Sequence, residues 1–75
     1  MDSLEIKEST NQLYQAISSL PEKQRIAFTL NKLEELPYAE VAEIMEVTLA
    51  SVESLIHRAK LSLQKKLSNY RNNTF

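Results

Sequence analysis

The sequence has 75 residues with a formal net charge of −1, and it contains no cysteine and no glycine. A chain this short forms one small domain with a thin core, and without cysteine it has neither disulfide bonds nor thiolate metal sites. Its single histidine and its short apolar runs exclude a histidine metal cluster, a membrane-spanning helix and a signal peptide. We therefore expect no metal, no cofactor and no membrane partner, and a cytoplasmic location fits the lack of cysteine.

The composition favours an all-α fold, because Glu, Lys, Leu and Ala are abundant and no stretch alternates apolar and polar residues. The first predicted helix covers residues 4–19. A second has Ser19 as its N-cap and Pro21 near its first turn, and it continues to about Glu35. The residues predicted to face the core are Leu13, Ala16, Ile17 and Leu20 on the first helix, and Ile26, Ala27, Leu30 and Leu33 on the second.

Pro37 separates these helices from two more, because proline lacks an amide donor and restrains the residue before it. A short helix is predicted over residues 38–45, and a long helix follows Thr48, which is a suitable N-cap. Their predicted core residues are Val41, Ala42, Ile44 and Met45, followed by Leu49, Val52, Ile56, Ala59, Leu63 and Leu67. The polar tail from residue 69 onwards is predicted to be disordered.

A short helix, a tight turn and a capped longer helix are the pattern of a helix-turn-helix, here at about residues 38–67. Ala42 allows the two helices to approach closely, while Val47 and Val52 hold the turn on the core. The predicted fold is therefore a small four-helix domain over residues 1–75, with a C-terminal helix-turn-helix and no wing. From the spacing alone, an ordinary antiparallel helical hairpin in a bundle stays an alternative.

The charges divide between the two parts of the chain. Residues 1–47 hold nine acidic and four basic residues, net −5, whereas residues 48–75 hold five basic residues and one acid, net +4. Such an asymmetry is typical of a basic element that meets phosphate groups. The alternative is a solvated basic helix end that is favoured by the helix dipole.

The stretch from residue 20 to residue 67 resembles region 4 of extracytoplasmic-function sigma factors. That family has a Leu-Pro pair, a Gln-Arg pair, a Tyr-Glu-x-Ile/Val-Ala segment and a recognition helix that ends in Arg-Ala. The matching residues here are Leu20-Pro21, Gln24-Arg25, Tyr38, Glu40-Val41-Ala42, Ile44-Met45, Thr48, Val52, Ser54 and Arg58-Ala59.

The resemblance implies a function in transcription initiation. Such domains bind the −35 element of double-stranded promoter DNA while attached to RNA polymerase, and they contact the polymerase β-flap. Anti-sigma proteins commonly restrain them. Region 2, which acts on the −10 element, is not in this sequence, so the resemblance implies a C-terminal fragment. We expect the chain to be a monomer and not an enzyme, because it has no nucleophile–base pair and no glycine loop.

Carried over by position, the candidates for contact with base edges are Glu53, Ser54, His57 and Arg58, and the candidates for contact with phosphate are Arg25, Tyr38, Thr48, Ser51 and Lys60. Arginine pairs with guanine and a carboxylate accepts from cytosine, whereas hydroxyls and amides at a helix start suit phosphate. Each has an alternative. Thr48 is a helix cap in any case, His57 is an ordinary surface histidine, and Arg58 pairs with a neighbouring carboxylate.

The chain departs from the family pattern at four positions. Glu53 and Leu55 stand where many relatives have basic residues, which lowers the attraction to phosphate and puts the recognised DNA sequence in doubt. Glu46 stands where relatives often have glycine or asparagine, and a left-handed glutamate there would cost roughly 1 kcal/mol. Pro37 replaces a serine cap.

Two other functions stay open. One is a protein-interaction module whose acidic first half and exposed Leu55 dock on the polymerase flap or an anti-sigma protein, with weak DNA binding. The other is an effector domain of the response-regulator type, which would dimerise through its last helix. The Leu20-Pro21 and Arg58-Ala59 motifs fit sigma factors better.

Overall fold

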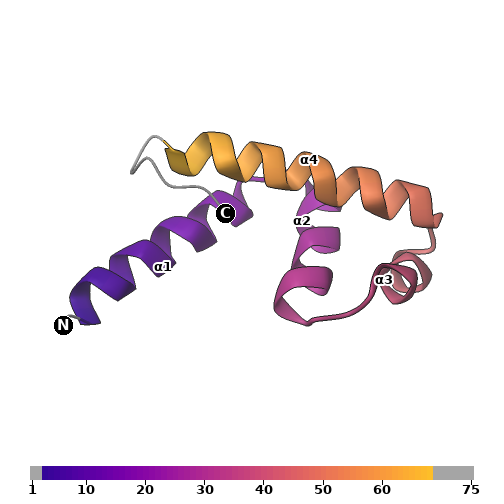
Figure 1. The fold of residues 1–75 in the computed structure, drawn as a ribbon, viewed down its shortest axis with the longest axis horizontal. Helices are drawn as coiled ribbons and strands as arrows, with labels where there is room; N and C mark the ends of the chain where they lie inside the picture. Colours follow the sequence, from indigo (N-terminus) through magenta and orange to yellow (C-terminus); the bar gives the residue numbers. More distant parts are fainter. Residues whose placement is uncertain (1–2, 69–75) are drawn as a thin grey trace.

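The long C-terminal helix is the element on which the rest of the molecule is assembled (Figure 1). This computed structural model describes the backbone of residues 3–68 and the side chains of residues 11–67. The elements in order are α1 (Ser3–Ser18), α2 (Glu22–Phe28), η1 (Thr29–Leu33), α3 (Tyr38–Met45) and α4 (Leu49–Ser68). α1, α2 and α3 each pack against α4, and the described residues include no strand. The predicted all-α class is confirmed.

The junction between α1 and α2 differs from the prediction at Ser19. The Ser19 hydroxyl donates a 2.7 Å hydrogen bond to the Ala16 carbonyl oxygen, and Pro21 holds the N-cap position of α2 without a side-chain cap bond. The reason is that proline disfavours helical backbone in the residue before it. α2 therefore starts after Pro21, and the prediction that Ser19 caps this helix is wrong.

The second helical segment changes from α to π geometry at Thr29. In η1 the Glu34 amide donates to the Thr29 carbonyl oxygen at 3.1 Å, five residues back instead of four. The wider turn rotates the side chains that follow it out of the α-helical register. Leu33, which the periodicity places in the core, is accordingly 44% exposed, while Phe28 is buried. The prediction for Leu33 is wrong for this reason.

The end of this segment is closed by a side chain. Nδ2 of Asn31 donates to the Leu36 carbonyl oxygen at 2.8 Å. The helical geometry ends at Leu33, two residues before the predicted end, and Glu35 has a positive φ of 60°. The chain then runs through Leu36 and Pro37 to the start of α3.

α3 has the predicted bounds, with Pro37 as an N-cap that makes no side-chain cap bond. Val41 and Ala42 are buried and Met45 is half-buried, but Ile44 is 54% exposed. Consecutive residues lie about 100° apart around a helix, so a short helix that packs with the Val41–Met45 side turns Ile44 toward solvent. The prediction that Ile44 is buried is wrong.

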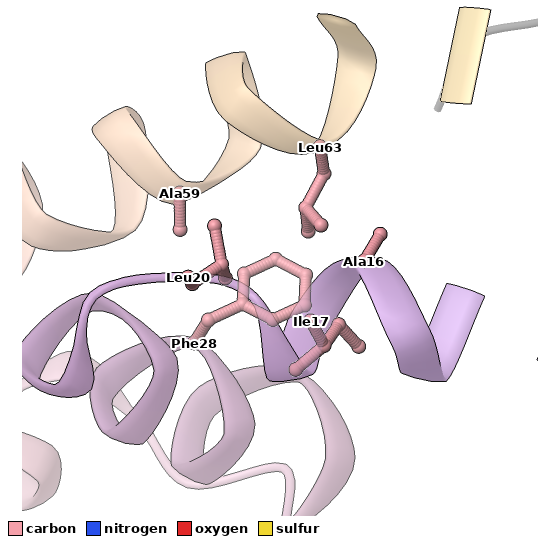
Figure 2. Close-up of a cluster of buried hydrophobic side chains, with 6 residues drawn as sticks. All are labelled: Ala16, Ile17, Leu20, Phe28, Ala59 and Leu63. Atoms are coloured by element: carbon pink, nitrogen blue, oxygen red, sulfur yellow. The ribbon is translucent and has the colours of Figure 1, made fainter. Parts of the chain in front are cut away.

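Two clusters of buried side chains hold the molecule together. The first, which we call the α1 cluster, joins α1 and α2 to the C-terminal half of α4; it consists of Ala16, Ile17, Leu20, Phe28, Ala59 and Leu63. Figure 2 shows the Phe28 ring inside this cluster, between the α1 and α4 side chains. The second, the α3 cluster, joins α2 and α3 to the N-terminal half of α4; its buried members are Ala27, Val41, Ala42, Val52 and Ile56.

The α4 stripe follows the predicted periodicity except at its first residue. Val52, Ile56, Ala59 and Leu63 are fully buried and Leu67 is half-buried. Leu49 is 47% exposed, because it precedes the part of α4 on which α3 packs. The prediction that Leu49 lies in the core is wrong. The predicted disordered tail from residue 69 lies outside the described residues.

Candidate nucleic-acid interface

The turn between α3 and α4 is a Schellman motif built on a left-handed glutamate. Glu46 has φ 61° and ψ 46°. The Val47 amide donates to the Ala42 carbonyl oxygen at 3.0 Å, and the Glu46 amide donates to that of Glu43 at 3.2 Å. Val47 packs on the α3 cluster. The turn therefore ends α3 sharply and anchors the start of α4, as a helix-turn-helix requires.

Thr48 is the N-cap of α4, as predicted. Its Oγ1 accepts a 3.1 Å hydrogen bond from the Ser51 amide and donates to the Ser51 Oγ at 3.0 Å. This arrangement satisfies one of the amides that have no intrahelical acceptor in the first turn of a helix. Leu49 and Ala50 lie between Thr48 and Ser51. Their amides also have no intrahelical acceptor, so they can donate to groups outside the helix.

The four residues predicted to contact base edges, Glu53, Ser54, His57 and Arg58, are all exposed. They share the N-terminal half of α4 with Val52 and Ile56, which are fully buried on the opposite side. From Glu53 to Arg58 the helix therefore presents a polar outer face, while its inner face is fixed by the α3 cluster. Such an arrangement can enter a groove without losing core contacts.

The five candidates for phosphate contact come from α2, α3, α4 and the N-cap of α4. Thr48 and Ser51 are exposed beside the outer face of α4. Arg25 is half-buried on α2, and Tyr38 is half-buried at the start of α3, where it packs on the α3 cluster. Lys60 is half-buried and lines a hollow elsewhere on the molecule. Thr48 and Ser51 lie at the start of α4, ahead of the base-facing candidates on the same helix.

The hollow lies between α1, the α2–η1 segment and α4, and has a volume of about 560 Å³. Its apolar lining consists of Leu13, Ile17, Phe28, Leu33 and Leu63, and its polar lining of Lys32, Lys60 and Gln64. Sequence periodicity does not indicate this feature, because the π turn of η1 brings Lys32 and Leu33 to its edge. It is an apolar surface with cationic side chains, suited to a protein partner.

Three positions near the start of α4 complete the surface. Leu49 and Ala50 are exposed, so the first turn of the helix presents apolar side chains. Leu55 is half-buried against the α3 cluster. The prediction that Leu55 is exposed for docking is therefore wrong, since its side chain faces the core of the motif.

Charge separates between the two helices of the motif. The exposed face of α3 carries Glu40 and Glu43, and its last turn leads to Glu46. α4 carries four basic residues and, as its one acid, Glu53. The described residues contain no cluster of side chains able to hold a metal ion, and no described helix combines the length and apolar character of a membrane span.

The short helix, the Schellman turn and the capped long helix with its polar outer face define a helix-turn-helix domain. The sequence profile of the family described as "Sigma-70, region 4" matches residues 10–63, and the chain belongs to this family. The family consists of non-catalytic transcription-initiation factors with a role in promoter recognition.

The similar proteins are extracytoplasmic-function (ECF) sigma factors. The chain is 37% identical over 67 residues to the ECF RNA polymerase sigma-E factors of Escherichia coli K12 and Salmonella typhimurium LT2, a match that covers 88% of this chain and 35% of each relative. It is 33% identical over 66 residues to the ECF RNA polymerase sigma factor SigW of Bacillus subtilis 168. The chain thus corresponds to region 4 of an ECF sigma factor and spans about a third of the length of these curated relatives.

Proposed function

We propose that this chain, as a single domain, recognises the −35 element of promoter DNA by inserting the N-terminal half of α4 into the major groove. The observation that carries the proposal is the exposed face of Ser54, His57 and Arg58 on a helix whose opposite face is fully buried. The major groove is about 12 Å wide and an α-helix with side chains measures about 10–12 Å, so one helix fits.

The proposed contacts follow from the chemistry of each group. Arg58 pairs with a guanine edge or a phosphate, and Glu53 accepts from a cytosine amino group. Ser51 and the free amides of the first turn bind phosphate at the start of α4. Arg25 and Tyr38 remain proposed phosphate contacts. Lys60, which also lines the hollow, remains a proposed phosphate contact too.

We propose the β-flap of RNA polymerase as the second partner, bound at the hollow. An apolar floor supplies the burial that a docked helix needs, and Leu33 stands half in solvent at its edge. An anti-sigma protein would compete for polymerase or DNA. Glu53 on the recognition helix weakens the attraction to DNA. Attachment to polymerase would offset this loss, because tethering raises the local concentration of the domain at the promoter.

The DNA contact is tested by titrating the chain with promoter-like duplex at low salt. Arg58→Ala is expected to weaken binding by about 5- to 150-fold if Arg58 makes a bidentate base contact. Lys66→Ala is the matched control, because it removes the same charge from the exposed last turn of α4. Binding that does not weaken with added salt, or equal losses in both variants, contradicts the proposal.

The polymerase contact is tested with two exposed leucines. Leu33→Asp, at the edge of the hollow, is expected to weaken binding to the polymerase β-flap severalfold, because a carboxylate would be buried in an apolar interface. Leu61→Asp is the control, since Leu61 is 52% exposed on α4 and does not line the hollow. Equal effects would place the polymerase contact elsewhere. Polymerase binding without any salt-dependent DNA binding would favour a pure interaction module.

A further inference from the structure

The first turn of α4 presents an apolar surface where the recognition helix begins. Leu49 leaves 47% of its surface in solvent and belongs to neither buried cluster. Ala50, the next residue, is exposed as well. Both lie ahead of Val52, the first α4 residue that packs on the α3 cluster. Nearly half of the Leu49 surface is therefore available to a ligand.

We propose that Leu49, with Ala50 beside it, contacts the C5-methyl group of a thymine and thereby helps to determine the DNA sequence that is bound. The inference rests on the proposed function, in which the N-terminal turns of α4 lie in the major groove. The thymine methyl is the apolar group on the major-groove edges of the bases, and aliphatic side chains contact it. Polar base edges or phosphate against Leu49 would lose water without gaining a hydrogen bond.

The position of the thymine follows from the geometry of the helix. Leu49 and Arg58 lie about 13 Å apart along the axis of α4, at the usual rise per residue. They therefore contact different base pairs, with the thymine at the opposite end of the recognised sequence from the base or phosphate that Arg58 contacts. Glu53 lies between them along the helix and contacts the intervening bases.

The experiment removes the methyl group and nothing else. Duplexes that bind the 75-residue chain are first enriched from a random library at low salt, and each thymine of the preferred sequence is then replaced by deoxyuridine. One such replacement is expected to weaken binding of the unaltered chain about four-fold, the effect of exposing one methyl group. Leu49→Ala should bind the thymine and deoxyuridine duplexes equally well, whereas Leu49→Met should still distinguish them.

The control variant is Leu61→Ala, which shortens an exposed leucine of the same helix far from its first turn. It is expected to keep the full preference for thymine. Sequence enrichment without any effect of deoxyuridine, or an equal effect in Leu49→Ala, overturns this inference and leaves the proposed function intact. Failure to enrich any sequence, with binding that does not depend on salt, overturns the proposed function and this inference together.

Discussion

Glu46 forms the turn of the helix-turn-helix in a conformation that its own side chain disfavours. A left-handed backbone costs a non-glycine residue about 1–2 kcal/mol, and asparagine tolerates it better. Glu46→Asn should therefore raise the free energy of unfolding by about 1 kcal/mol, as measured by chemical denaturation. Glu43→Asn, on the helix that Glu46 ends, is the control, since it replaces a helical glutamate and should destabilise slightly. Equal effects at both positions would contradict a strained turn.

Glu53 limits the attraction of the recognition helix to DNA. It is exposed on the outer half of α4 and is the one acid of that helix. Glu53→Lys should strengthen binding to all duplexes and steepen the plot of log affinity against log salt by about one unit. It should also change the preference at one base pair, because a lysine cannot accept from cytosine. Stronger binding with an unaltered preference would remove Glu53 from the residues that contact bases.

At the scale of the helix, the Thr48 cap fixes where α4 begins. Thr48→Ala removes the acceptor of the Ser51 amide and should lower the free energy of unfolding by about 1 kcal/mol. Thr48→Asp should restore most of this stability, because aspartate is an equally good N-cap. Ser54→Ala, an exposed hydroxyl on the same helix, should change stability by less than about 0.5 kcal/mol. A loss in Ser54→Ala as large as that in Thr48→Ala would argue against the cap as its cause.

The elements that a local pattern could predict are those with a regular period and a clear boundary. Pro37 and Thr48 mark the bounds of α3 and α4 in the sequence itself, and the outer face of α4 follows from the stripe that it buries. Periodicity assumes one continuous register, so it could not find the π turn that exposes Leu33. Nor could it show that Leu49 lies beyond the reach of α3, because that depends on how two helices pack.

The candidate site divides in the same way. The exposed positions of Ser54, His57 and Arg58 are a property of one helix and could be expected from the sequence. The hollow joins residues from α1, η1 and α4, so only the tertiary structure shows it. Lys60 illustrates the difference: its charge suggests phosphate, whereas its half-buried place in the hollow suggests a protein partner.

At the scale of the whole molecule, α4 and α2 are the two helices that contribute buried residues to both clusters. Ala59 and Leu63 belong to the α1 cluster, and Val52 and Ile56 to the α3 cluster. Because α4 is one continuous helix, loss of packing in either cluster should destabilise the other. Since each cluster alone is small, we expect the domain to unfold as one cooperative unit.

Hydrogen exchange can test this coupling across the molecule. Leu63→Val removes one methylene from the α1 cluster and should cost roughly 1 kcal/mol, equivalent to about five-fold faster exchange by global unfolding. The Val47 amide, which bonds to the Ala42 carbonyl oxygen in the helix-turn-helix, should accelerate as much as the Leu20 amide, which bonds to that of Ile17. Val41→Ala in the α3 cluster should likewise accelerate exchange of both amides, including the Leu20 amide at the α1 cluster. If each substitution instead accelerated exchange only in its own cluster, the two halves would open separately, and a partner bound at the hollow could not stabilise the N-terminal half of α4 through its C-terminal half.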